Sequence, residues 1–209
     1  MLTGVTAVFE EIIDRFISSS SEFEQKLVAV HPCQWSWPTP CTEWNVRQLV
    51  NHMTQGNLNY VRLLSGATRA EFLRLRDADA LGADPLGAYA RSVRECAAAF
   101  TCPGALEQVL DYPLGQVAGQ QALAVRTTDT IIHTWDLARA IGADDTLSPD
   151  LVAWASDHLG EIYDGLAETP VAAKTAHRFF AAPSGELPAS APQQHHLLHR
   201  MGRRPVHAL

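Results

Sequence analysis

Asp129 and His133, two residue types that commonly bind metals, lie four positions apart in the stretch AVRTTDTIIHTWDLARAIG, whose composition predicts a helix. Positions i and i+4 share one face of a helix, so the carboxylate and the imidazole should point the same way. His52 lies in a second helical stretch, VRQLVNHMTQGNLNYVRLL. If the two helices pack together, these residues offer three protein ligands to a divalent metal and leave a coordination position open for chemistry.

The same spacing also has ordinary explanations. Aspartate and histidine at this separation often form a buried pair or part of a solvated face. Asp129 is flanked by Val125, Ile131 and Ile132, and a carboxylate beside so much apolar surface is costly to bury unless a positive group meets it. A divalent cation would meet it, and so would Arg126. A structural polar cluster that sets helix register is a further interpretation.

Three polar residues beside the metal candidates are predicted substrate contacts. They share helix faces with His52 and Asp129, because residues three or four apart on a helix are neighbours. These residues are Gln55, Asn59 and Arg126. Gly56, one turn after His52, is expected to leave room beside the imidazole ring because it has no side chain.

Asp136 follows His133 by three residues and has two interpretations. A metal-binding imidazole commonly donates the N–H of its other ring nitrogen to a carboxylate. Asp136 is therefore predicted to accept this hydrogen bond from His133 and to orient its ring. The alternative is a salt bridge with Arg139 on the same helix. The sequence leaves both open.

Two weaker candidates for chemistry lie elsewhere. His195 and His199 are also four residues apart, but the tail around them is polar and suggests no third ligand. Cys41 lies beside a helix start, which could lower the pKa of a catalytic thiol. The spacing of the cysteines fits neither a zinc ribbon nor a secreted disulfide framework, so free or core thiols are expected at Cys33, Cys41, Cys96 and Cys102. The remaining histidines are expected to be surface or hydrogen-bonded residues; they are His31, His158, His177, His196 and His207.

Apolar periodicity and capping signals predict a helical chain. Asn45 and Gln48 form a capping box, with Trp44 and Leu49 placed to pack across the helix start. Helices are predicted at about 5–30, with a possible interruption at serines 18–21, from Val46, at about 85–100, at about 121–141 and at about 151–166. Residues 105–119 are ambiguous and could contain a short extended segment, and QQHHLLHRMG could add one short helix.

The predicted fold is all-α, an antiparallel up-down four-helix bundle with additional short helices and a C-terminal tail. Residues 1–168 should form the metal-binding bundle. Beyond Thr169 the composition becomes proline-rich, so residues 169–209 are expected to be a tail packed on the bundle and no separate domain.

Composition excludes several classes of protein. The chain has 209 residues, of which 46% are hydrophobic, enough for a substantial core. Sixteen basic and 23 acidic residues give a net charge of −7, and no basic cluster could follow a phosphate backbone, so nucleic-acid binding is not expected. No basic leader or apolar run of membrane-spanning length is visible. We expect a cytoplasmic protein, monomeric or homodimeric.

The strings WPTPCTEWNVRQLVNHM and IIHTWDLARAIG, together with the FFAAP segment and LLHRMGRRP, resemble a known family. It is the group of actinobacterial DinB/YfiT-like proteins related to the metal-binding domain of mycothiol-dependent maleylpyruvate isomerase. The resemblance implies a four-helix bundle that binds zinc or nickel through His52, Asp129 and His133. The isomerase has a glutamate where Asp129 stands, so the carboxylate of Asp129 is shorter by one methylene and its mono- or bidentate mode is left open. The isomerase also carries a further C-terminal domain that helps form its active site, so its isomerisation reaction is not carried over.

The resemblance also implies a class of mechanism. The open metal position would receive the thiolate of mycothiol or a similar small thiol, and the partners would be this thiol and an electrophilic substrate. A thiol-dependent transferase or isomerase follows. Two alternatives remain, a non-catalytic module that binds or senses a metal or small thiol, and a hydrolase that uses metal-bound water.

Overall fold

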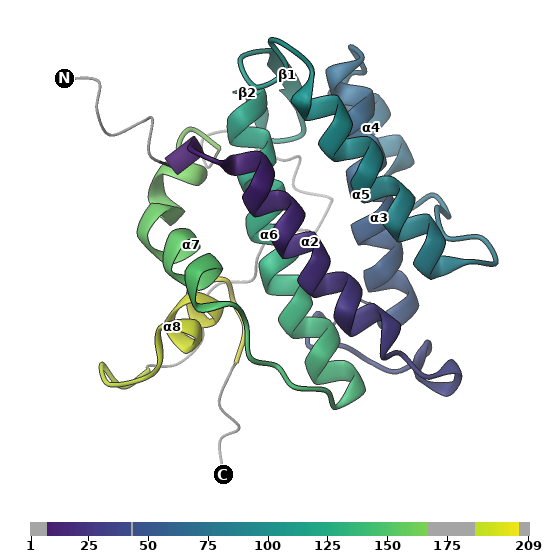
Figure 1. The fold of residues 1–209 in the computed structure, drawn as a ribbon, viewed down its shortest axis with the longest axis vertical. Coiled ribbons are helices and arrows are strands. Elements are labelled where there is room, and N and C mark those ends of the chain that lie inside the picture. Colours follow the sequence, from purple (N-terminus) through teal and green to yellow (C-terminus); the bar gives the residue numbers. More distant parts are fainter. Residues whose placement is uncertain (1–7, 43, 167–186, 205–209) are drawn as a thin grey trace.

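The computed structural model describes residues 8–42, 44–166 and 187–204, and this part of the chain is mostly helical (Figure 1). A single two-stranded antiparallel sheet accompanies the helices within these residues. The elements are α2 (Ile12–Val28), the short 3-10 helix η1 (Pro32–Gln34), α3 (Val46–Leu64), α4 (Arg69–Leu75), α5 (Pro85–Thr101), β1 (Val109–Tyr112), β2 (Gly115–Ala118), α6 (Gly119–Ile141), α7 (Pro149–Ile162) and α8 (Gln193–Arg200).

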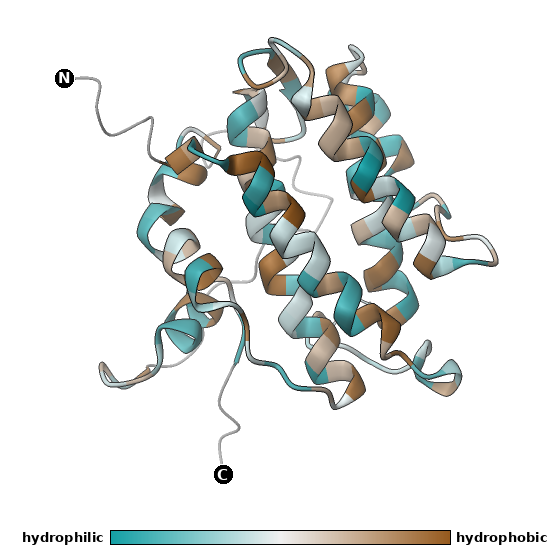
Figure 2. Ribbon diagram, viewed as in Figure 1, coloured by the Kyte–Doolittle hydropathy of each residue, from teal (hydrophilic) through white to brown (hydrophobic). Residues whose placement is uncertain are grey.

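The four longest described helices pack against one another. Helix α2 contacts α6 and α5, and α3 contacts α5 and α6. Brown and teal residues alternate along α2 and α5 in Figure 2, as expected for helices with one buried face. None of the described helices has the length and apolar character needed to cross a membrane.

Helix α6 is buried on nearly every side, with 19 of its 23 residues buried. Polar residues inside such a helix need hydrogen-bond partners. Its threonines find them on the helix itself, because each hydroxyl donates to the carbonyl oxygen four residues earlier: Thr127, Thr128, Thr130 and Thr134. The charged side chains of α6 have no backbone partner of this kind, so they pair with one another and with groups from other elements.

Local signals in the sequence placed most elements correctly. Helix α3 starts at Val46 behind the predicted capping box, in which the Asn45 side chain accepts from the backbone N–H of Gln48. Asp84 caps α5, and Ser148 with Pro149 begins α7. The ambiguous 105–119 segment contains the β1–β2 hairpin, and the histidine-rich tail contains α8.

Two expectations at the ends and interior of helices were wrong. Helix α2 runs unbroken through the serine run, because Ser19 and Ser20 are buried and the Ser19 hydroxyl donates to the Phe16 carbonyl. The chain instead changes direction at Glu11, which has a left-handed φ of 54°. Helix α7 ends at Ile162, four residues before the predicted end.

The start of the predicted first helix, residues 5–7, lies outside the described residues, as do His177, His207 and tail residues 169–186. No helix or strand was predicted in residues 65–83, which contain α4. Thr68 and Glu71 form a capping box there that the sequence does contain.

Helix α8 packs into the main core although it lies near the end of the chain. Leu197, Leu198 and Met201 belong to the same buried cluster as residues of α2, α3 and α6. Helix α8 also contacts α7. The described part of the C-terminal tail is therefore attached to the helical core.

Truncation of Leu198 tests whether α8 contributes to the stability of the whole core. Leu198→Ala should lower the free energy of unfolding by about 2–5 kcal/mol in one cooperative transition, because the side chain is fully buried. Leu86→Ala is the control, since Leu86 is 39% exposed, and should change stability by less than about 1 kcal/mol. Urea denaturation followed by circular dichroism measures both; a separate minor transition in Leu198→Ala would contradict a shared core.

Candidate metal centre

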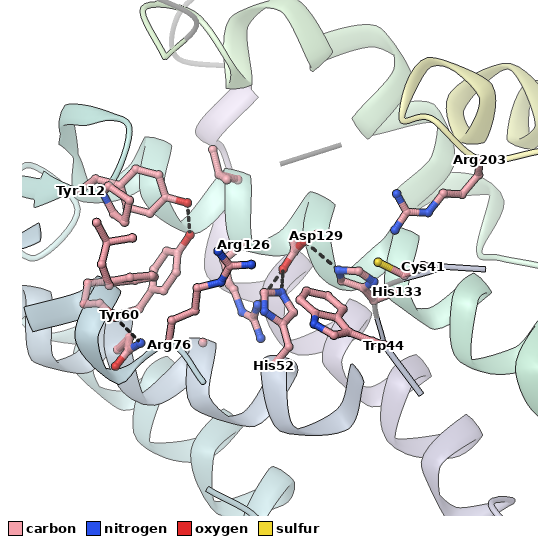
Figure 3. Close-up of a pocket in the computed structure, with 16 residues that line it drawn as sticks. Cys41, Trp44, His52, Tyr60, Arg76, Tyr112, Arg126, Asp129, His133 and Arg203 are labelled. Carbon is pink, nitrogen blue, oxygen red and sulfur yellow. Dashed lines mark hydrogen bonds and ion pairs between the residues drawn. The ribbon is translucent and has the colours of Figure 1, made fainter. Parts of the chain in front are cut away.

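The structure brings His52 of α3 together with Asp129 and His133 of α6 (Figure 3). The Nε2 atom of His52 lies 3.1 Å from Asp129 Oδ2, and the Nε2 atom of His133 lies 3.2 Å from Asp129 Oδ1. The two imidazoles thus face opposite oxygens of one carboxylate. Among the described residues this is the one group of three or more such side chains close enough to hold a metal ion.

The hydrogen bonding of His133 leaves an unusual contact at its Nε2 atom. Its Nδ1 atom lies 2.9 Å from Asp136 Oδ2, and a carboxylate only accepts, so Nδ1 must carry the proton. In the neutral imidazole, Nε2 then has a lone pair and no proton. That lone pair points at the Asp129 oxygen, which is also an acceptor. A proton or a cation must lie between them.

The electrostatics of the triad follow from burial and the shared carboxylate. Burial lowers the pKa of His52 to about 4, so this imidazole is neutral near pH 7. Burial alone would also lower the pKa of His133, but the Asp129 and Asp136 carboxylates outweigh it and raise that pKa. Burial opposes ionisation of Asp129, yet the charges and hydrogen bonds of His133 and His52 hold its pKa well below the usual range.

Arg126 supplies the positive charge that the buried Asp129 requires. Its Nη1 atom lies 2.8 Å from Asp129 Oδ2, and its side chain is 2% exposed. Its other donors bond to Asn57 Oδ1 at 2.8 Å and to the Met53 carbonyl oxygen. Arg126, predicted as a substrate contact, lines the pocket but is committed to these internal partners.

The missing side chain of Gly56 makes room for the Arg126 guanidinium. The prediction that it leaves space beside the His52 ring was wrong, because Arg126 fills that space. A Cβ atom at Gly56 would lie 2.7 Å from Arg126 Nη1 and 2.8 Å from its Cζ atom. Real Cβ atoms do not approach other atoms so closely. The guanidinium therefore rests against the bare backbone of α3.

Asp136 is held by a residue from the far end of the chain. Arg203 places Nε 3.0 Å from Asp136 Oδ1 and Nη2 2.5 Å from Asp136 Oδ2. The Asp136 side chain is fully buried and that of Arg203 is 6% exposed. The alternative pairing with Arg139 does not occur, because Arg139 pairs with Asp145. Arg203 thus holds the Asp136 carboxylate in the position from which it accepts a hydrogen bond from His133 Nδ1.

The loop before α3 places Trp44 and Cys41 at the site. The Trp44 ring stacks on His52 with ring centroids 4.4 Å apart and lies 5.6 Å from the His133 ring. The Thr39 hydroxyl donates to the Trp44 and Cys41 carbonyl oxygens at 2.8 and 3.0 Å, which holds the loop closed. Cys41 forms no disulfide bond and lines the pocket. The sequence indicated Trp44 only as a packing residue.

The triad lies in a pocket that encloses about 860 Å³, part of it open to solvent. Of the other predicted substrate contacts, Asn59 lines this pocket and Gln55 does not. The Gln55 amide instead donates to Asn59 Oδ1 at 2.9 Å. The opposite end of the pocket is apolar and aromatic, formed by Tyr60, Phe72, Leu73, Tyr112, Pro113 and Val125. Arg76, Tyr112 and Arg203 are pocket residues that sequence reasoning missed.

The rival histidine pair gains no third ligand. His195 and His199 both lie on α8, and within residues 8–42, 44–166 and 187–204 no acidic, cysteine or histidine side chain completes a metal-binding group with them.

Replacement of Gly56 tests the packing of Arg126. Gly56→Ala should lower stability or displace Arg126 from Asp129, although alanine favours a helix over glycine by about 1 kcal/mol. Gly160→Ala in α7 is the matched control, because nothing lies within 4 Å of a Cβ atom there. Thermal unfolding should show stabilisation of the Gly160 variant only; equal stabilisation of both would contradict the close approach.

Comparison with known proteins found one matching family and two similar proteins. Residues 18–138 match the family described as the mycothiol maleylpyruvate isomerase N-terminal domain. Two uncharacterised proteins of Mycobacterium tuberculosis, from strains CDC 1551 and H37Rv, are each 33% identical over 132 residues. The aligned region covers 62% of this chain and 66% of each relative, slightly under two thirds of their length. No solved structure matches significantly. The match spans more than half of the chain and includes His52, Asp129 and His133, so the chain belongs to the family of the mycothiol maleylpyruvate isomerase N-terminal domain.

Proposed function

We propose that the protein binds one divalent metal ion, zinc or nickel, through His52, Asp129 and His133, and that it is a mycothiol-dependent transferase or isomerase. The supporting observation is that the Nε2 atoms of His52 and His133 converge on the two oxygens of Asp129, at 3.1 and 3.2 Å. A proton on His133 or a divalent cation between these atoms satisfies the contact, and two imidazoles with one carboxylate are ligand types that zinc and nickel bind. We further propose that α2, α3, α5 and α6 form the four-helix bundle of DinB-like proteins and that residues 1–168 are its metal-binding unit.

The donor set fits a metal of this kind. Ligands bound tetrahedrally to zinc at about 2.0–2.1 Å lie about 3.3 Å apart. His52 Nε2 lies 3.1 Å from Asp129 Oδ2, and His133 Nε2 lies 3.2 Å from Asp129 Oδ1, so aspartate reaches both histidines despite being one methylene shorter than glutamate. One ligand atom from each of the three residues lies within 4.8 Å of the others, close enough to hold one ion. Three protein ligands leave at least one position for another group, as in catalytic zinc sites.

A divalent cation at this site would bind the sulfur of a small thiol and lower its pKa, so that a thiolate exists near neutral pH. The chain's own residues prepare the site. Asp136 keeps the Nδ1 proton on His133 and thereby aims Nε2 at the site. Arg126 holds Asp129, and Trp44 covers one face of the His52 ring. In a transferase reaction the thiol sulfur bonds to an electrophilic carbon, its proton passes to solvent, and the leaving group departs with the electrons of the broken bond.

Metal content is the first test of this proposal. Protein purified without a histidine tag and dialysed against zinc should retain close to one ion per chain by elemental analysis. His52→Ala should lose the ion while keeping its helical circular dichroism, because the buried apolar residues of α3 remain. His158→Ala is the control, since His158 lies on α7 beside Glu161. Metal-free wild type, or equal loss in both variants, would refute the metal site.

Thiol binding is tested separately by calorimetry. Zinc-loaded protein titrated with mycothiol should release heat that is absent with an analogue in which a hydroxyl replaces the thiol. His133→Ala should abolish that heat because it removes a metal ligand. Equal heats for wild type and variant, or none in either, would remove the thiol and favour metal-bound water as the nucleophile. Conjugation of mycothiol to monobromobimane at no more than the uncatalysed rate would favour a non-catalytic binding module.

A further inference from the structure

Arg76 is an arginine that lines the pocket beside the triad. It caps the C-terminal end of α4 and is partly buried. Among the described residues, no hydrogen-bond acceptor or carboxylate pairs with its guanidinium. Two carboxylates of the surrounding segments pair with other arginines: Asp79 pairs with Arg47, and Asp111 pairs with Arg69.

The positive charge of Arg76 is not balanced by a carboxylate among the described residues of the pocket. Three arginines line it, Arg76, Arg126 and Arg203. Arg126 is paired with Asp129, and Arg203 is paired with Asp136. One positive charge therefore remains, in a protein whose net charge is −7. The unpaired charge of Arg76 therefore suits the pocket to an anion, with or without a cation at the triad.

Helix α4 is held firmly over the pocket, which gives Arg76 a defined position. The backbone N–H of Arg69 donates to Asp111 Oδ2 at 2.9 Å, and the Arg69 side chain pairs with Asp111 Oδ1 on β1 at 3.1 Å. The Asn59 amide of α3 also lies 3.4 Å from the Phe72 carbonyl oxygen. Phe72, Leu73 and Arg76 then line the pocket from one side.

Three aromatic rings form the wall beside Arg76. The Tyr60, Phe72 and Tyr112 rings contact one another with centroid separations of 6.0, 5.7 and 5.9 Å. In Figure 3 the Arg76 side chain lies between Tyr60 and the triad. Such a wall suits a flat, unsaturated or aromatic body, and an arginine suits a carboxylate because its two N–H groups match the two oxygens.

We propose that Arg76 binds the carboxylate of the electrophilic substrate, a small molecule with a flat apolar body, and holds its reactive carbon toward the triad. This proposal rests on the proposed function for the reaction but not for the binding of the anion.

Binding of benzoate to metal-free protein tests Arg76 without involving the metal. Benzoate supplies a ring and a carboxylate, and benzamide is its neutral counterpart. In the presence of a chelator, benzoate should bind at least about tenfold more tightly than benzamide, as expected for a hydrogen-bonded charge. The Kd values come from NMR titration of the protein.

Arg76→Gln should weaken benzoate binding about tenfold or more and leave benzamide unchanged. Arg74→Gln is the matched control, because Arg74 is exposed on the same helix and does not line the pocket. Circular dichroism verifies that both variants are folded, and Arg76→Lys should bind with intermediate affinity. Equal affinity of wild type and Arg76→Gln, equal weakening in Arg74→Gln, no preference for benzoate over benzamide, or no binding to wild type would each overturn the assignment. Loss of metal binding with this result intact would refute the proposed function alone.

Discussion

A carboxylate buried inside a helix that is itself buried is the constraint on which this site depends. Asp129 lies near the middle of α6, where the helix backbone cannot satisfy its charge. Arg126 meets one oxygen, and the imidazoles of His52 and His133 meet both. The Arg126 guanidinium needs space beside α3, and the His133 ring needs a hydrogen-bond partner that sets its orientation. Gly56 admits the guanidinium, and Asp136 sets the tautomer of His133.

Support for the site reaches the end of the described chain. Arg203 holds Asp136 from a position 67 residues away in sequence. Helix α8 immediately precedes Arg203, and its leucines are buried in the main core. Residues outside the span that matches the family therefore complete the surroundings of residues inside it. The C-terminal segment thus contributes Arg203 to the lining of the pocket.

The local features of this fold could be predicted, and the long-range ones could not. Capping boxes and proline positions determine helix starts over a few residues, so α3 and α5 began where expected. The triad was also predictable, because helical periodicity fixes one pair and the family resemblance indicates His52. The partnership of Asp136 with Arg203 and the stacking of Trp44 on His52 depend on how distant segments pack, which periodicity does not determine. Arg76 was missed because its helix, α4, was missed, although Thr68 and Glu71 signal that helix.

The zinc K-edge X-ray absorption spectrum of the metal-loaded protein tests the central claim most directly, because it counts the atoms around the metal. The account predicts a first shell of nitrogen and oxygen at about 2.0–2.2 Å with the multiple-scattering signature of two imidazoles. Addition of mycothiol should add one sulfur at about 2.3 Å. A sulfur present before thiol is added would implicate Cys41 as a ligand. A shell unchanged by mycothiol would contradict an open, thiol-binding site.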